Sequence, residues 1–234
     1  MIRGRADKDE SADRRPSLVE DAYAAMKDEI RESRFPPGYQ ASEQEIALRL
    51  GMSRTPVHEA AIRLQEDGLV RILPRKGILI CALAPEDVRE IYDVVIAIEG
   101  RAAALLADMP EVRREATAAE LSRLTTTMAE AEAAGDLAAW GRADEGFHRT
   151  LVERAGNGRM IRINQTINDQ AHRARMLTLK LRRELNASVS EHRQIIEAIR
   201  TGDAEAAQER AHRHRVRARD ELLPLLASFG LKHL

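Results

Sequence analysis

The sequence predicts a mainly α-helical protein of two parts: a small N-terminal unit of three helices with a β-hairpin, and a longer all-α antiparallel helical bundle. Up to residue 83, short capped helical segments alternate with turn signals and two β-type runs. From residue 84 onward, long helical stretches are separated only by short glycine-containing breaks. Composition agrees, because aromatic residues make up only 3% of the chain, which favours helices over sheets.

Composition also limits the class of protein. The chain has 234 residues, of which 44% are hydrophobic and 32% charged, an ordinary balance for one or two folded domains. The single cysteine, Cys81, excludes an internal disulfide and a multi-cysteine zinc module, so we expect a reducing cytoplasm. No apolar run reaches the ~20 residues of a membrane helix. Residues 1–16 have no apolar centre like that of a secretory signal, and we interpret them as a flexible charged arm.

Residues 17–83 form the predicted N-terminal unit. A first helix covers about 17–34 and is ended by the prolines and glycine of FPPGYQ. Ser42 caps a second short helix, and Glu45, three residues later, completes a capping box. Ser53 caps a third helix. The runs LVRIL and GILICAL, joined by PRKG, then predict a hairpin, or wing.

The second and third helices are joined by the tight turn GMS, which is typical of a helix-turn-helix. In that motif the start of the second helix faces base edges in the major groove of DNA. Arg54 can donate two hydrogen bonds to guanine, and short hydroxyl donors beside it suit phosphates. We expect DNA contacts from Ser53, Arg54, Thr55, His58, Arg75 and Lys76. The alternative is a generic three-helix unit with solvated arginines, and the net charge of −1 gives nucleic-acid binding no independent support.

Residues 84–234 are predicted to form the helical bundle, because short loops between helices make neighbouring helices antiparallel. We expect this part to carry the metal site, the effector site and the dimer interface. Helices are predicted over 85–107, 111–134, 136–155, 158–182, 187–201 and 203–227.

Four polar residues fall on the apolar stripes of three of these helices. Asp144 and His148 share one face at i and i+4, two later histidines lie on buried stripes, and His212 lies with Arg215 on the solvent side. A buried carboxylate needs partners, and imidazoles with one carboxylate suit a borderline divalent metal. Any one histidine alone would be interpreted as a hydrogen-bonded core residue. Together they predict a site for zinc, or else nickel or manganese, at Asp144, His148, His192 and His214.

Several stretches resemble a known family. SRTPVHEAAIRLQEDGLV and the preceding PPGYQASEQEIALRLGM are similar to the winged-helix signature of the GntR family of bacterial transcription regulators. IYDVVIAIEGRAAALLA, DEGFHRTLVERAGNGRM and SEHRQIIEAIRTGDAEAAQERAHRH resemble the FCD effector domain of its FadR-like branch. The resemblance implies base contacts by Arg54. It also implies a metal held by Asp144, His148, His192 and His214. Relatives often carry arginine in place of Gln44 and His58. Gln44 can pair with adenine, so we expect an altered operator.

The effector site departs from the family pattern. Many relatives grip a ligand carboxylate with an arginine at the position of Val95, so an organic-acid effector needs another cation here. Asn168, His172 and Arg175 lie at i, i+4 and i+7 and are the candidates; a solvated polar face is the alternative.

Together these features predict a metabolite-responsive repressor that is not an enzyme and that binds a palindromic double-stranded operator as a homodimer. A metal-dependent hydrolase and a constitutive DNA binder with a structural metal are the alternatives.

Overall fold

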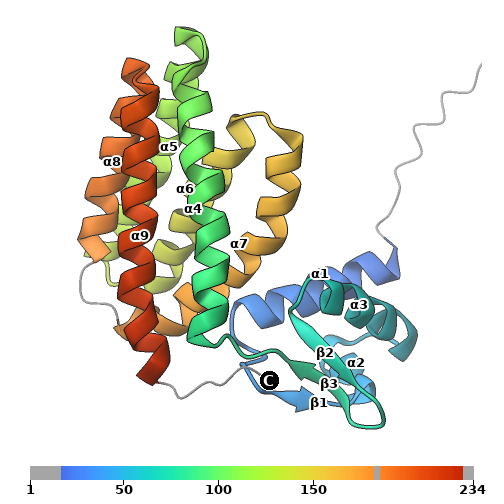
Figure 1. Ribbon diagram of the computed structural model, residues 1–234. Coiled ribbons are helices and arrows are strands. Elements are labelled where there is room, and N and C mark those ends of the chain that lie inside the picture. Colours follow the sequence, from blue (N-terminus) through green and yellow to red (C-terminus); the bar gives the residue numbers. More distant parts are fainter. Residues whose placement is uncertain (1–16, 182–184, 229–234) are drawn as a thin grey trace, which may run out of the picture.

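The computed structural model describes residues 17–181 and 185–228 and contains two packed parts (Figure 1). The predicted arm at 1–16 lies outside the described residues. The first part holds three helices and a small sheet, and the second consists of long helices that run beside one another. The mainly α-helical class predicted from the sequence is therefore confirmed. Among the described residues, no helix combines the length and apolar character needed to cross a membrane.

The N-terminal part is a three-helix unit with a three-stranded antiparallel sheet in the order β1-β3-β2. Its elements are α1 (Leu18–Arg31), β1 (Gln40–Ala41), α2 (Glu43–Leu50), α3 (Arg54–Glu66), β2 (Val70–Leu73) and β3 (Gly77–Ile80). The hairpin of β2 and β3 was predicted, whereas the two-residue strand β1 was not.

The predicted capping box fixes the start of α2. The Ser42 hydroxyl accepts from the Glu45 amide at 3.2 Å, and the Glu45 carboxylate accepts from the Ser42 amide at 2.6 Å. Gly51 ends α2 with φ +67°, a left-handed conformation that glycine adopts at little cost. Ser53 stands at the N-cap position of α3, but its side chain makes no capping hydrogen bond, so that part of the prediction is wrong. The Ser53 hydroxyl is therefore exposed and makes no hydrogen bond that caps α3.

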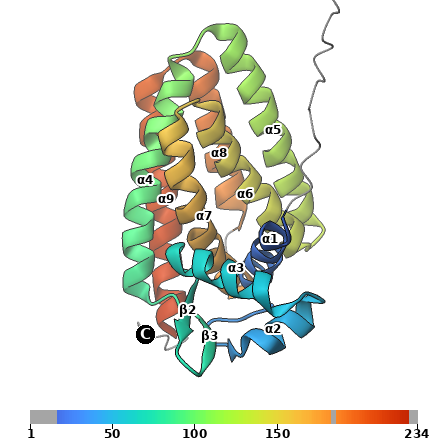
Figure 2. The same cartoon turned by 90° about the vertical axis from the view of Figure 1, so that its right-hand side faces the viewer.

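The helical bundle has the antiparallel arrangement predicted from its short loops, with α4 and α9 side by side in both views (Figures 1 and 2). Its elements are α4 (Pro85–Ala107), α5 (Glu111–Ala133), α6 (Leu137–Arg154), α7 (Gly158–Thr178), the 3-10 turn Leu179–Leu181, α8 (Leu185–Thr201) and α9 (Ala204–Ser228). The helix predicted over 158–182 is therefore too long, because α7 gives way to the tighter turn after Thr178.

The bundle core forms where α4, α5, α6, α8 and α9 meet. Phe147, Leu151, Leu121, Ile195 and Ile199 are almost fully buried there. Each such side chain stabilises the fold by about 1.5–3 kcal/mol. The polar groups of the candidate site lie on the same helices as this core, which holds their backbones in place.

The two parts meet through α7. The Arg173 guanidinium donates to the Cys81 carbonyl at 2.5 Å, and the Gln170 amide donates to the Asp67 carbonyl at 2.9 Å. Helix α1 also lies against α7 (Figure 2). One face of α7 therefore contacts the N-terminal part.

Candidate functional site

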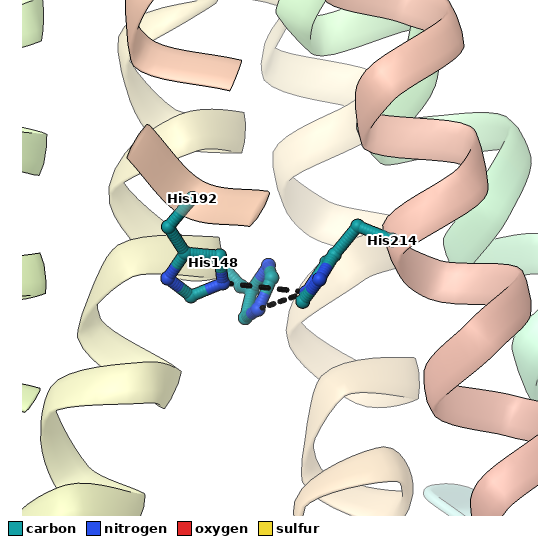
Figure 3. Close-up of side chains that lie close together, drawn as sticks. All are labelled: His148, His192 and His214. Atoms are coloured by element: carbon teal, nitrogen blue, oxygen red, sulfur yellow. Dashed lines mark hydrogen bonds between the residues drawn. The ribbon is translucent and has the colours of Figure 1, made fainter. Parts of the chain in front are cut away.

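Three histidines from three different helices converge inside the bundle (Figure 3). They are His148 of α6, His192 of α8 and His214 of α9, and all three are buried. The Nε2 atom of His214 lies 3.3 Å from the Nε2 atoms of both His148 and His192. One ligand atom from each residue lies within 4.8 Å of the other two. This close approach brings together three of the four predicted metal ligands.

A buried carboxylate orients His148. The Nδ1 atom of His148 lies 2.9 Å from the Glu99 carboxylate. The guanidinium of Arg215 donates two hydrogen bonds to the same carboxylate, at 2.7 and 2.5 Å. Burial works to raise the pKa of Glu99, but the charge of Arg215 and the contact with His148 outweigh it, so this pKa lies well below its usual value. Glu99 is therefore an ionised acceptor that turns the other ring nitrogen of His148 toward the cluster.

His214 has the same kind of support, and His192 does not. The Nδ1 atom of His214 lies 2.7 Å from the Glu191 carboxylate, which also accepts two hydrogen bonds from Arg217. The ring of His192 instead stacks on Phe147, with ring centroids 3.7 Å apart. Its buried Nδ1 makes no hydrogen bond within the described residues.

These contacts determine which ring nitrogens carry hydrogen. A carboxylate only accepts, so Nδ1 of His148 and of His214 carries hydrogen, and Nε2 of the neutral His214 ring is a bare lone pair. Burial, followed by the charge of a neighbouring histidine, lowers the pKa of His192 and of His214 well below the usual value. This lone pair of His214 faces ring nitrogens of both His148 and His192 across 3.3 Å.

A cation between the rings would be coordinated by the Nε2 atoms that converge there. Nitrogen atoms bound tetrahedrally to zinc at about 2.0–2.1 Å stand about 3.3 Å apart. That value matches the spacing of the Nε2 atoms. The side chains therefore fit a divalent metal.

Asp144, the fourth predicted ligand, lies at the edge of this cluster. Its Oδ1 atom is 3.5 Å from Nε2 of His148 and 3.9 Å from Nε2 of His192. Its Oδ2 atom accepts a hydrogen bond from Arg175 at 2.9 Å. Burial opposes ionisation, but the charge of Arg175 outweighs it and holds the pKa of Asp144 well below its usual value. One carboxylate oxygen thus faces the histidines while the other is held by an arginine.

The three candidate effector residues on α7 point into the protein. Asn168, His172 and Arg175 are all buried, so the alternative of a solvated polar face is wrong. Arg175 is engaged with Asp144 through Nη1, while its buried Nη2 makes no hydrogen bond in the described part of the chain. Neither ring nitrogen of His172 makes a hydrogen bond there either. Nη2 of Arg175 therefore remains an unused donor beside Asp144, whereas the ring nitrogens of His172 lie 3.4 Å from Glu145 and 3.7 Å from Glu32. Asn168 lines a pocket between α1, α6 and α7, so the structure does not bring the three candidates together at the histidines.

The residues predicted to contact DNA are all exposed. Arg54 and His58 stand at the start of α3 with side chains 68% and 50% exposed. Both are held by one carboxylate of α2: Glu43 lies 2.8 Å from Nε of Arg54 and 2.7 Å from Nδ1 of His58. The hydrogen bonds from Arg54 and then His58 lower the pKa of Glu43. The remaining predicted contacts are exposed on α2, α3 and the wing, at Gln44, Ser53, Thr55, Arg75 and Lys76.

Two known family profiles match this chain, one in each of its two parts. The family profile described as "Bacterial regulatory proteins, gntR family" matches residues 18–80, and the FCD domain profile matches residues 90–217, more than half of the chain. The chain belongs to the GntR family. Its second part is an FCD domain.

Relatives in the GntR family are named as transcriptional regulators. The chain is 58% identical over 134 residues to an HTH-type regulator in the TAR-I ttuE-ttuC' intergenic region of Agrobacterium vitis, covering 57% of this chain and 78% of that protein. It is 31% identical to the regulator YdhC of Bacillus subtilis, over 82% of this chain and 85% of that protein. It is 32% identical to a probable D-xylose utilization operon repressor of Paenarthrobacter nicotinovorans, over 80% of each chain.

Solved structures share the fold of this GntR chain. A GntR regulator of Rhodococcus superposes with a TM-score of 0.75 at 23% identity, over 89% of this chain and 99% of that chain. McbR/YncC of E. coli superposes with a TM-score of 0.77 at 18% identity, over 93% of this chain and 100% of that chain.

The sequence analysis missed four residues that hold site side chains. Glu43 holds Arg54 and His58 on the DNA-binding part, and Glu99, Glu191 and Arg215 surround the histidines of the bundle. Helical spacing placed Arg215 on the solvent face beside His212, and that prediction is wrong, because Arg215 is buried against Glu99. A signal existed for Glu99, since a charge within an apolar helix stripe requires a buried partner. That partner is 116 residues away in the chain, so spacing could not identify it.

Proposed function

We propose that this GntR-family chain is a metabolite-responsive transcriptional repressor whose FCD domain holds a divalent metal and a small effector. The observation that carries the proposal is the convergence of three buried imidazoles, in which Nε2 of His214 lies 3.3 Å from Nε2 of both His148 and His192. A cation shared by the three rings fits this spacing and accepts the lone pair of each Nε2 atom.

The metal ligands are His148, His192 and His214, with Oδ1 of Asp144 as the fourth. Imidazole nitrogens with one carboxylate suit zinc, and nickel or manganese are alternatives. A bound divalent metal supplies open coordination positions for an oxygen-containing effector. Nη2 of Arg175 lies on the adjacent helix beside Asp144 as an unused donor, which supports an organic-acid effector, with His172 and Asn168 of α7 as the further candidates.

DNA binding is assigned to the exposed start of α3 and to the wing. Arg54 reads guanine, and Ser53, Thr55 and His58 contact bases or phosphates around it. Gln44 reads a second base, and Arg75 with Lys76 at the wing tip contacts the backbone. Glu43 holds Arg54 through Nε and His58 through Nδ1, so the Nη groups of Arg54 and Nε2 of His58 can contact DNA while this carboxylate orients both side chains.

We further propose that the protein is a cytoplasmic homodimer that binds a palindromic operator. A two-fold symmetric protein presents two such helices to one face of DNA. A repressor role is supported by the name of the Paenarthrobacter relative. The effector acts by binding one arrangement of the two DNA-binding parts more tightly. The metal-dependent hydrolase is not retained, because the family consists of transcriptional regulators.

Selection of genomic DNA fragments by the purified full chain tests this function. We expect a small set of enriched fragments that share a palindrome, bound by the wild type and lost by Arg54→Ala. Arg89→Ala, which changes an exposed arginine of α4, is the matched control and should select the same fragments. Enrichment that does not differ between wild type and Arg54→Ala would contradict the assignment.

A further inference from the structure

A network of ion pairs joins α1 to the bundle. Lys27 of α1 pairs with Asp169 of α7 at 2.5 Å, and Arg31 of α1 pairs with Asp169 at 3.3 Å. Arg31 also bonds to Glu145 of α6, the residue next to the candidate metal ligand Asp144. Arg31 therefore connects the DNA-binding part to both α6 and α7.

A pocket of about 570 Å³ opens beside this network, between α1, α6 and α7. Pockets of this size hold small metabolites. Four basic and three acidic side chains line it, which leaves a net positive charge. The three histidines of the candidate metal centre are not among its lining residues, so it is a separate site.

Two of the four basic residues are available for a ligand. Arg149 of α6 and Arg162 of α7 are exposed and form no ion pair or hydrogen bond within residues 17–181 and 185–228. A second polar group is also unused: Asn164 lines the pocket with only 4% of its surface exposed, and its Oδ1 atom has no hydrogen-bond partner in the described chain. A buried acceptor of this kind calls for a donor.

These features define the ligand chemistry. Two guanidinium groups can donate several hydrogen bonds to the three strong acceptor oxygens of a phosphate monoester. Glu153, which also lines the pocket, can accept from a hydroxyl group of the ligand. The unused Asn164 oxygen accepts from a hydroxyl group. Asn168 and Thr166, which also line the pocket, offer further hydrogen bonds to hydroxyls.

We propose that this junction pocket binds a small phosphorylated polyol, with Arg149 and Arg162 holding the phosphate and Asn164 accepting from a hydroxyl. The bound anion competes with Glu145 and Asp169 for Arg31. Occupation of the pocket therefore weakens the hold of the bundle on α1.

Calorimetric titration of the full chain with glucose 6-phosphate, at constant ionic strength, tests the site. Arg149→Ala and Arg162→Ala should each weaken binding at least about tenfold, because each removes a charge-assisted hydrogen bond. Arg142→Ala is the matched control, since Arg142 is exposed on α6 but does not line the pocket. Glu145→Gln should tighten binding, because it frees Arg31. All four variants change exposed or half-buried residues and should fold.

Two further comparisons distinguish the ligand class. Glucose should not bind, and gluconate should bind at least about tenfold more weakly than the phosphate ester, because it carries one charge. Gluconate binding as tightly as the phosphate ester would overturn the ligand class. Equal affinity of wild type, Arg149→Ala and Arg162→Ala for glucose 6-phosphate would overturn the site.

Hydrogen exchange of the α1 amides should accelerate when glucose 6-phosphate is added, and unchanged exchange would overturn the coupling to α1. None of these measurements uses DNA or metal, so they succeed or fail independently of the proposed function.

Discussion

At the scale of single residues, helical periodicity predicted which histidines face inward but not what holds them, and it placed the buried Arg215 on the wrong face. His192 and His214 are buried and His212 is exposed, as their spacing indicated. Spacing within one helix fixes only the face on which a residue lies. The bonds from Nδ1 of His148 to Glu99 and from Nδ1 of His214 to Glu191 join different helices, so spacing within one helix does not reveal them.

Arg54→Lys tests whether the proposed base contact depends on guanidinium geometry. Lysine keeps the charge but lacks the planar pair of donors that matches guanine. We expect affinity for a selected operator to fall by about 1–3 kcal/mol while affinity for random DNA stays the same. Fluorescence anisotropy with both DNAs measures the difference. An equal loss on the two DNAs would show that Arg54 contacts only phosphates.

His172 gives stability a specific pH dependence. Burial, followed by the charge of Arg175, lowers the pKa of His172 to about 4 from the usual 6.5. Between these values the unfolded chain binds a proton that the folded chain excludes, so this group costs stability as pH falls from 6.5 towards 4. The full effect is about 3 kcal/mol.

Urea unfolding of metal-free protein between pH 7.5 and 4.5 measures this effect. His172→Gln should remove one part of the acid sensitivity, while the parts contributed by the other buried histidines remain. Identical pH slopes for His172→Gln and the wild type would contradict the low pKa.

At the scale of elements, long periodic helices were predictable and short or irregular ones were not. The bounds of α4 follow the pattern because Pro85 opens the helix. Strand β1 has two residues after a proline-rich turn, too few to show a period of two, and it exists because Gln40 and Ala41 pair with Leu79 and Ile78. Where a strand is too short for its sequence pattern to predict it, pairing with a strand distant in sequence determines that it forms.

Gly77→Ala tests the close packing of the wing against β1. Gly77 has φ +93°, and a Cβ atom there would stand 2.3 Å from the Ala41 carbonyl oxygen. We expect the substitution to destabilise the sheet by about 3 kcal/mol or more, measured by hydrogen exchange of the β2 and β3 amides. Gly38→Ala is the control, with φ +78° and no atom within 4 Å, and should cost only about 1–2 kcal/mol. Equal effects would show that backbone conformation alone explains the glycine.

The proposed metal joins α6, α8 and α9, so it should stabilise the bundle. Zinc at one hundred times its dissociation constant adds about 2.7 kcal/mol to the free energy of unfolding, and His192→Ala should lose most of this gain. His212→Ala is the matched control, because it removes an exposed histidine of α9. Melting temperatures with and without zinc give the comparison. A zinc-dependent rise that survives in His192→Ala would place the metal elsewhere.

At the scale of the whole molecule, the sequence predicted two parts but not how they meet. Helix α7 carries Arg175 toward Asp144 of the candidate metal centre and Asp169 and Arg173 toward the DNA-binding part. A movement of this one helix can therefore link the two parts. No local pattern reveals such a contact, because its partners are about a hundred residues away in the chain.

The central claim is that one metal joins the three histidines inside a DNA-binding regulator. The X-ray absorption spectrum of the zinc-loaded full chain tests it most directly. Three imidazole nitrogens and one oxygen at about 2.0–2.1 Å are the predicted ligands. A sulfur ligand at about 2.3 Å would instead place the metal at Cys81, the only cysteine, between the two parts. That result, or fewer than three imidazoles, would contradict the account.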